Sequence, residues 1–242
     1  MILDLDVGNS RVKWRLSASH GPKGSMSYAS IGGIEEKTFR PHDGSISRIR
    51  VSSVRSANCR STLDTWAKAV YGVSPEYAVS AARVGKVCNG YDNPETLGVD
   101  RWLALLAAFE LAGAAVCVID YGSAITADLL DSSGMHLGGF ISPGLDLMRA
   151  SLLSGTDLVR FPPSVEGGIF CPGTRTASAV ESGILASAAG FGNMCWQSFR
   201  SSVGPITSFV TGGDAEKILP LLNFPAALQP TLVLDGLALA LP

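Results

Sequence analysis

Alternation of apolar and polar residues at the start of the chain predicts a β-hairpin. Residues 1–7 alternate like a half-buried strand, and residues 11–16 resume the alternation after a short polar break. Gly8 and Asn9 lie in that break, and such a pair between two alternating segments is typical of a tight turn. Asp6 adds an acidic side chain to the end of the first strand, which an ordinary buried strand does not need.

Hydrophobic patterning predicts strands and helices along the rest of the chain. Residues 99–111 carry apolar side chains on every face of a helix, so this helix is expected to be buried. Residues 88–98 contain Asn-Gly and Asn-Pro pairs and are expected to form a loop. The polar segment 17–47 is expected to form further strands and loops. Other expected elements are strands at 48–56 and 207–213, three strands joined by two turns over 114–144, helices at 61–69, 145–153, 176–190 and 215–222, and a strand leading into a helix at 231–241.

The first hairpin has a counterpart in the second half of the chain. "LDLDVGNSRVKW" at residues 3–14 and "CVIDYGSAITADL" at residues 117–129 share an apolar strand, an Asp-x-Gly turn with small residues, and a second strand. Such self-similarity indicates a duplicated unit. We expect an α/β protein with halves 1–113 and 114–242, in which the corresponding pairs are Asp6 and Asp120, Gly8 and Gly122, Asn9 and Ser123, and Ser10 and Ala124.

These turns have the composition of a phosphate-binding loop. Glycine has no Cβ, so a phosphate can approach the main-chain N–H groups closely. An aspartate such as Asp6 can hold a hydrated cation that offsets the phosphate charge, and Lys13 on the returning strand can reach the same oxygens. An ordinary turn with polar residues at the surface explains one hairpin equally well, but two hairpins, one in each half, favour a nucleotide site.

Composition excludes several classes of protein. Of 242 residues, 46% are hydrophobic and 17% are charged, and the formal net charge is −2. Without a basic block we expect neither a nucleic-acid partner nor a membrane partner. The acidic and basic residues within 1–16 argue against a signal peptide. Five scattered cysteines without a CxxC pair argue against a disulfide framework or a zinc site. We therefore expect a soluble cytoplasmic protein.

Several polar residues outside the hairpins have structural explanations. We expect Asp128 and Asp131 at a turn, and Asp214 at the start of a helix as its cap. His136 receives no catalytic role, and His42 is expected to be solvated.

Seven stretches together resemble the type III pantothenate kinases, within the superfamily of acetate and sugar kinases, heat-shock protein 70 and actin. They run in the family's order over nearly the whole chain. The resemblance implies two ribonuclease H-like (actin-like) α/β domains with a nucleotide cleft between them. The stretches are "DVGNSRVKW" (6–14), "YDNPETLGVDRW" (91–102), "IDYGSAITADLL" (119–130), "GGFISPGLDLM" (138–148), "TASAVESG" (176–183), "TGGDA" (211–215) and "LDGL" (234–237).

The resemblance also implies roles for individual residues. Asp100 would be the catalytic base, Asp120 would bind a monovalent cation, K⁺ or NH₄⁺, and Ser123 would contact the ATP phosphates. Thr176 would contact pantothenate from the partner subunit of a homodimer. The first ATP-phosphate loop would comprise Asp6, Val7, Gly8, Asn9, Ser10, Arg11, Val12 and Lys13, and the pantothenate site Tyr91, Gly98, Val99, Asp100 and Arg101. Mg²⁺ would accompany ATP. The family usually has threonine where this chain has Ser10 and Ser123, so we expect looser contacts there.

The chemistry of residues 98–101 fits a kinase independently. Asp100 follows a glycine at the start of a helix, where exposed N–H groups would keep its carboxylate ionised. Arg101 is suited to a substrate carboxylate, which a guanidinium binds through two hydrogen bonds. The alternative is that Asp100 caps the helix and Arg101 forms a surface ion pair, while Tyr91 packs as a loop aromatic.

The expected activity is ATP-dependent phosphorylation of pantothenate to 4'-phosphopantothenate, the first step of coenzyme A biosynthesis. Two alternatives remain at this point. One is an actin-like nucleotide-binding regulator without kinase activity. The other is a kinase that acts on a different small hydroxy acid or sugar.

Overall fold

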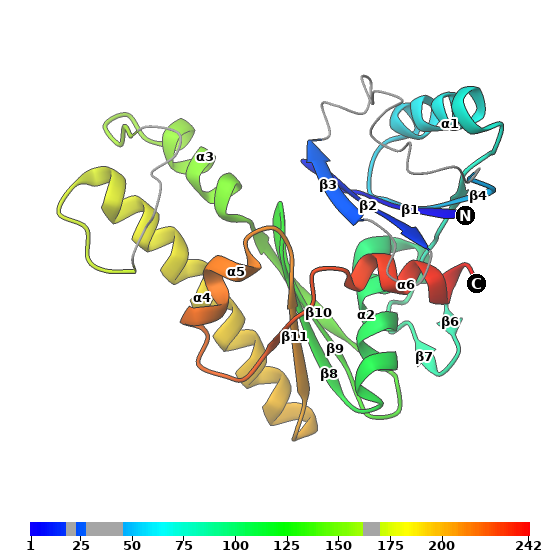
Figure 1. The fold of residues 1–242 in the computed structure, drawn as a ribbon. Coiled ribbons are helices and arrows are strands. Elements are labelled where there is room, and N and C mark those ends of the chain that lie inside the picture. The colour runs from blue at the N-terminus through cyan, green and yellow to red at the C-terminus, as the bar shows by residue number, and fades with distance from the viewer. Residues whose placement is uncertain (18–22, 28–45, 162–169) are drawn as a thin grey trace. The chain divides into compact units, whose positions relative to one another are not determined.

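The computed structural model of the protein describes residues 1–17, 23–27, 46–161 and 170–242 (Figure 1). The chain forms two compact units, one made of residues 1–111 with 231–242 and the other of residues 112–230. Most of the polar segment 17–47, including His42, lies outside the described residues, although β3 (Lys23–Ser27) within it is a strand.

The first unit is built on a five-stranded sheet in the order β3-β2-β1-β4-β5. The predicted hairpin is present as β1 (Ile2–Val7) and β2 (Arg11–Ser17), which pair antiparallel. β4 (Arg48–Ser53) and the short β5 (Glu76–Tyr77) extend the sheet in parallel with β1.

One face of this sheet packs on a helix. Alternate side chains of β1 and β4, including Leu3, Leu5 and Val51, form a core with Leu63 and Ala67 of α1 (Ala57–Tyr71). The helix ends at Gly72, whose φ of 69° is a left-handed conformation that glycine adopts without strain. Two-residue periodicity in the strands therefore separates an apolar face from a polar one.

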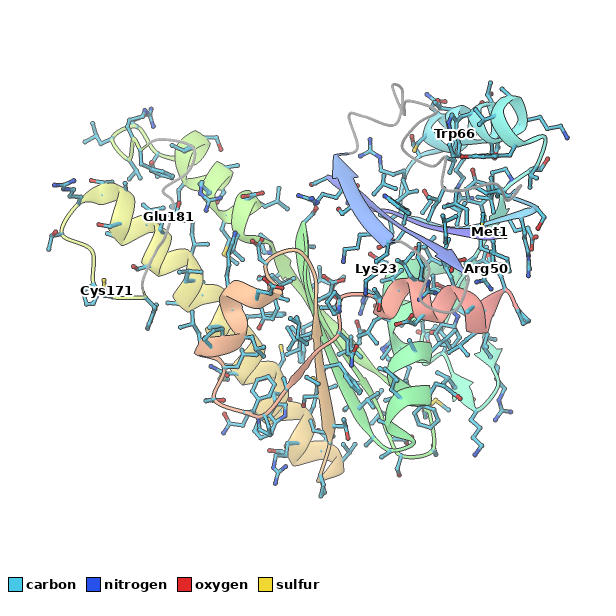
Figure 2. All side chains as sticks on the ribbon, in the orientation of Figure 1. Met1, Lys23, Arg50, Trp66, Cys171 and Glu181 are labelled. Atoms are coloured by element: carbon cyan, nitrogen blue, oxygen red, sulfur yellow. The ribbon has the colours of Figure 1, made fainter. Side chains whose placement is uncertain are left out.

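The polar residues of β1 and β4 meet α6 (Leu232–Ala240), which contacts both strands. Asp4 is fully buried, and the Nε atom of Arg50 donates to Asp4 Oδ1 at 2.8 Å. Arg50 also donates to the carbonyl of Leu241 at 2.9 Å, and Figure 2 labels this arginine beside α6. A buried acid in β1 is thus neutralised by arginine.

The C-terminal segment differs from the expectation in two ways. Residues 232–240 are helical throughout, without a leading strand. They also pack in the first unit, whereas the expected second half ran from residue 114 to residue 242. An apolar run such as "TLVLDGLALAL" suits a buried strand and a buried helix equally, so its packing partners decide between them.

The remaining elements of the first unit are α2 (Val99–Ala112) and the segment that precedes it. Eight successive residues of this helix, 101–108, are buried, as its all-round apolar pattern predicted. The segment before α2 contains the short strands β6 (Arg83–Val84) and β7 (Val87–Cys88), which pair with each other, and the 3₁₀ turn η2 (Pro94–Thr96).

The second unit repeats the connectivity of the first. Its five-stranded sheet has the order β10-β9-β8-β11-β12, with antiparallel pairing in the first three strands and parallel pairing from β8 to β12. Both sheets therefore place their first, second and third strands as an antiparallel meander and add the next two in parallel. This confirms the predicted duplication and the two ribonuclease H-like α/β domains. The strands are β8 (Val116–Tyr121), β9 (Ala124–Leu130), β10 (His136–Pro143), β11 (Thr207–Thr211) and β12 (Ala227–Leu228).

Helices cover the core of the second sheet. Buried residues of β8 and β9, such as Ile119 and Ile125, pack with Ile184 and Ala188 of α4. This helix continues well beyond the glycine at which we expected it to end. The helices are α3 (Leu145–Gly155), α4 (Thr176–Val203) and α5 (Ala215–Ile218), followed by the 3₁₀ turn η3 (Leu219–Leu221).

Two of the predicted turn residues behave differently from each other. Asp131 lies at the β9–β10 turn and accepts hydrogen bonds from the backbone N–H groups of Ser133 and Met135. Asp128 instead lies within β9, is buried, and is 3.0 Å from His136 Nε2. The expectation for Asp128 is therefore wrong, because β9 continues through this residue and its carboxylate pairs with a histidine of the neighbouring strand.

Among the helices in the described part of the chain, none is both long and apolar enough to cross a membrane.

Candidate active site

The first hairpin places a glycine turn at the end of β1. Asp6 lies opposite Lys13 in the strand register, and both side chains are half-buried. The Gly8 N–H donates to the Arg11 carbonyl at 3.0 Å, and a Cβ on Gly8 would lie 3.2 Å from that oxygen. Asn9 and Ser10 are exposed at the tip. The turn therefore presents short polar side chains and main chain to solvent, with a carboxylate and an ammonium at its base.

Two arginines lie at the same turn. Arg11 donates from Nε to Ser25 Oγ on β3 at 2.9 Å, so its guanidinium points along the sheet. Arg55 follows β4 and donates to the Asn9 carbonyl at 3.4 Å. Sequence reasoning did not single out Arg55, because an arginine shortly after a strand carries no signal for this contact. Positive charge close to a glycine turn favours anion binding.

The second hairpin has the same plan with a shorter turn. β8 ends at Tyr121 and β9 begins at Ala124, so only Gly122 and Ser123 form the turn, against three residues in the first hairpin. The Gly122 N–H donates to the Ala124 carbonyl at 3.2 Å. Asp6 and Asp120 thus occupy equivalent strand positions, while the residues after the glycine are offset by one.

Glycines pack closely around Asp120. A Cβ on Gly122 would lie 3.0 Å from Asp120 Oδ1, and one on Gly212 would lie 2.5 Å from the same oxygen. Gly212 has a φ of 100°, which an L-residue rarely adopts. The Asp214 N–H donates to the Tyr121 carbonyl at 3.0 Å, which joins the end of β11 to the end of β8. Two glycine-containing features of the sequence, the Asp-x-Gly turn and the Gly-Gly pair, therefore lie against each other.

Helix starts border this second turn. The Gly144 N–H, just before α3, donates to the Ser123 carbonyl at 3.1 Å, and a Cβ on Gly144 would overlap the main chain of residues 122–123. Asp214 occupies the N-cap position of α5 as expected, but its carboxylate accepts from Lys217 Nζ at 2.7 Å and makes no cap hydrogen bond to the main chain.

Asp100 and Arg101 open α2. The Arg101 N–H donates to Asp100 Oδ1 at 2.8 Å, which fixes the carboxylate at the helix N-terminus. Gly98 provides room for it, since a Cβ there would lie 2.7 Å from Asp100 Oδ1. Arg101 is 8% exposed and donates from Nη1 to Tyr91 Oη at 2.9 Å. Arg101 therefore does not lie at the surface as a member of an ion pair, and the Tyr91 hydroxyl accepts a hydrogen bond from its guanidinium.

Side chains that sequence reasoning missed hold the loop before α2. Asn89 donates from Nδ2 to the Pro94 carbonyl at 3.1 Å and accepts from the Tyr91 N–H at 3.0 Å. Ser80 is buried and donates to the Leu97 carbonyl at 2.8 Å. These bonds fix the main chain on both sides of Tyr91. The Asn-Gly pair marked a loop, but nothing local indicated what the asparagine bonds.

Thr176 is the first residue of α4 and belongs to the second unit, whereas Tyr91 and residues 98–101 belong to the first. It is exposed and lines an open cavity of about 620 Å³ between α3 and α4. Met148, Leu152 and Val180 also line this cavity, so its surface is largely apolar.

Burial keeps the ionisable tyrosine and cysteine side chains beneath the second hairpin in their neutral forms. Desolvation raises the pKa of Tyr121 and of Cys117 well above their usual ranges, and it raises the pKa of Cys195 to about 11. These side chains therefore stay neutral, and the carboxylate of Asp120 is the acidic group at the end of β8.

Within the described ranges 1–17, 23–27, 46–161 and 170–242, no group of three His, Cys, Asp or Glu side chains is placed to bind a metal ion. A cation at Asp6 or Asp120 would therefore need further oxygen ligands from phosphate or water, which is how Mg²⁺ is commonly bound beside nucleotides.

Comparison with known proteins finds a consistent family. Residues 2–198 match the model of the family described as type III pantothenate kinase. The chain is 40% identical over 252 residues to a type III pantothenate kinase of Pseudomonas syringae pv. syringae, with 100% of this chain and 99% of that protein covered. It is 41% identical over 249 residues to the protein of the same description from Ectopseudomonas mendocina, with the same coverage.

Solved structures share the fold at lower identity. A Campylobacter jejuni protein assigned to the Baf family of transcriptional activators aligns with a TM-score of 0.59 and 20% identity, covering 98% of this chain and 95% of that one. The ethanolamine utilization protein EutJ from Carboxydothermus hydrogenoformans aligns with a TM-score of 0.56 and 12% identity, covering 98% and 89%.

Proposed function

Because the chain belongs to the type III pantothenate kinase family, we propose that it transfers the terminal phosphoryl group of ATP to the primary hydroxyl of pantothenate. The product is 4'-phosphopantothenate, and the reaction is the first step of coenzyme A biosynthesis. Relatives that match over the full length of this chain support the assignment to the whole protein.

The two hairpins are proposed to bind the phosphates of ATP. In the first, residues 6–13 offer the exposed tip of the turn, with the side chains of Asn9 and Ser10, and the ammonium of Lys13. In the second, Ser123 offers a hydroxyl group beside Gly122. Repetition of the Asp-x-Gly turn at the same position of two sheets with identical connectivity supports a shared role. N–H groups exposed at a glycine turn are suited to bind phosphate oxygens.

Residues 98–101 and Tyr91 are proposed to bind pantothenate. The Asp100 carboxylate would accept the proton of the pantothenate hydroxyl group. The hydroxyl oxygen would bond to the γ-phosphorus as the bond from that phosphorus to ADP breaks and ADP leaves. Phosphoryl transfer needs mainly alignment and charge neutralisation, so a carboxylate of ordinary basicity is sufficient. Arg101 would bind the substrate carboxylate, and its position against Tyr91 supports this role because the tyrosine restricts the guanidinium to one direction.

The proposal includes cations and a second subunit. Asp6 would bind the Mg²⁺ that accompanies ATP through water, and Asp120 would bind K⁺ or NH₄⁺. Carboxylate oxygens are the ligands that Mg²⁺ prefers, and their negative charge also attracts a monovalent cation. Thr176 would contact pantothenate from the partner subunit of a homodimer, and its exposed position beside an apolar cavity supports a contact outside its own unit. We propose that the enzyme acts in the cytoplasm.

The arrangement of Gly98, Asp100 and Arg101 is the observation that supports a kinase most strongly. A regulator that only binds nucleotide needs neither a carboxylate held at a helix N-terminus nor a nearly buried arginine beside it. The experiment is to measure ADP release with a panel of alcohols that contains pantothenate, other small hydroxy acids and sugars. Turnover with pantothenate alone supports the proposal, turnover with another alcohol changes the substrate, and ATP binding without turnover on any alcohol favours a regulator.

A further inference from the structure

The "LDGL" stretch at residues 234–237 has no role in the function proposed above, yet it makes unusual contacts. It lies in α6, within the first unit, and this helix contacts β1 and β4. Figure 1 shows α6 beside α2 and next to the sheet that carries the first hairpin. One turn of α6, residues 234–236, contacts both β2 and α2 and is called the linking turn.

The linking turn is bonded to β2. Arg15 forms an ion pair with Asp235 and donates from Nη2 to the Leu234 carbonyl at 2.6 Å. The same Nη2 donates to Asp4 Oδ2 on β1 at 3.1 Å. Thr231 donates to the other oxygen of Asp235 at 2.9 Å, so both carboxylate oxygens are bonded. Arg15 therefore fixes the linking turn to the two strands of the first hairpin.

The linking turn also packs directly on α2. Gly236 is buried, and a Cβ placed on it would overlap the carbonyl oxygen of Leu103 and lie 2.5 Å from its carbonyl carbon. The obstruction is main chain, which a change of rotamer cannot relieve. Glycine at this position is thus what allows the backbones of the two helices to touch, as small residues do in close helix contacts.

We propose that Asp235 and Gly236 are positioning residues, which fix α2, with the catalytic base Asp100, relative to the β1–β2 hairpin that binds phosphate. This inference rests on the proposed kinase function. Leu103 lies three residues after Asp100, about one helical turn. Arg15 lies two residues after Lys13, so both side chains project from the same face of β2. The linking turn therefore contacts both elements close to their functional side chains.

A change in the linking turn should slow the chemical step more than it weakens binding. Asp235 and Gly236 do not belong to either proposed substrate site, so the affinities of the separate sites should persist. Alignment between base and phosphate depends on both elements, and a displacement of about 1 Å can reduce turnover about 100-fold.

The experiment compares two variants of the full chain with matched controls. Gly236→Ala tests the helix contact, and its control is Gly190→Ala in α4, because a Cβ on Gly190 meets nothing within 4 Å. Asp235→Asn tests the ion pair, and its control is Glu76→Gln, which removes the carboxylate that pairs with Arg48 at 2.8 Å in the same unit. For each, kcat and KM for both substrates are measured, together with hydrogen exchange of residues 11–16 and 99–103 without ligand.

We expect kcat to fall by about 10- to 100-fold in both test variants, with each KM within about threefold of wild type and faster exchange in both segments. The controls should match wild type. A kcat within twofold of wild type in a folded Asp235→Asn or Gly236→Ala variant would overturn the inference, as would equal losses in Glu76→Gln. If wild type itself fails to phosphorylate pantothenate, the proposed function fails instead, and the hydrogen exchange still reports whether the linking turn holds both segments.

Discussion

Arg101 and Tyr91 form one assembly at the N-terminus of α2, with Nη1 2.9 Å from the phenolic oxygen and the guanidinium 5.7 Å from the centre of the same ring. The tyrosine holds the arginine by a hydrogen bond and by a cation–π contact. These two contacts restrict the orientation of the guanidinium in the absence of substrate. A substrate carboxylate would therefore bind an arginine that is already oriented.

Replacing Arg101 with lysine should therefore raise the KM for pantothenate. A lysine retains the charge but loses the planar set of donors, and one hydrogen bond to a charged group is worth about 1.5–3 kcal/mol, or about a 10- to 100-fold change. Tyr91→Phe should give a smaller increase. Steady-state kinetics with varied pantothenate measure both, and Arg83→Lys serves as a control. An unchanged KM in Arg101→Lys would remove the arginine from the substrate site.

Replacing Asp100 with asparagine should reduce kcat by about 100- to 10,000-fold, which is the usual contribution of a general base. The amide oxygen can still accept the Arg101 N–H, so α2 and the affinity for ATP should be preserved. Turnover and ATP binding by calorimetry test this. Normal turnover would mean that another group takes the proton.

Replacing Gly98 with alanine should displace Asp100 without removing it. The added Cβ would lie 2.7 Å from Asp100 Oδ1, and the carboxylate must move to relieve the overlap. We expect kcat to fall about tenfold or more, with little change in the thermal midpoint of unfolding. Gly155→Ala is the control, because its Cβ meets nothing within 4 Å. Equal kcat in both variants would contradict the role given to Gly98.

The turn between β9 and β10 should make stability depend on pH. A hydrogen bond from the Ser133 hydroxyl, with further bonds from main-chain N–H groups, lowers the pKa of Asp131. Since this pKa is lower in the folded state, its stabilisation is present above the unfolded value of about 3.9 and is lost as pH falls through the folded value. Asp131→Asn should therefore reduce the urea concentration at the midpoint of unfolding at pH 7, but not at a pH below the folded pKa of Asp131. The control, Asp157→Asn, should have little effect on this midpoint at either pH.

The cysteines should differ in reactivity toward a thiol reagent at pH 8. Cys171 is exposed, as Figure 2 shows, and Cys88 is half-buried, so both should react in the native protein. Cys117 and Cys195 are buried, and their raised pKa values leave almost no thiolate at this pH. Mass spectrometry after brief labelling identifies the sites. Rapid labelling of Cys117 would show that the core of the second unit opens in solution.

Local patterns predicted the parts of the fold that are strongly periodic. The two hairpins and the duplication were readable because strand alternation and the Asp-x-Gly turn recur at residues 3–14 and 117–129. The burial of the helix at 99–111 could be predicted because apolar residues occupy all of its faces. These features depend on neighbours in sequence, which is where periodicity is informative.

Contacts between distant residues decided what local patterns could not. Gly190 does not end α4, and Gly192 nearby has a structural use, since a Cβ there would overlap the Tyr121 hydroxyl. Arg55 belongs to the candidate site through a bond to the main chain of Asn9 in another strand connection, and Asn89 through bonds to the main chain of its own loop. A glycine inside a helix and an arginine after a strand have no sequence signature that identifies these roles.

The path of the chain sets an order for its folding during synthesis. Residues 112–230 form a continuous unit and can complete their core as soon as they leave the ribosome. The first unit begins earlier but needs residues 231–240, so the buried Asp4 and its arginines stay uncovered until the last helix arrives. The unit whose strands are translated first is thus expected to complete its fold only after residues 112–230 have been translated.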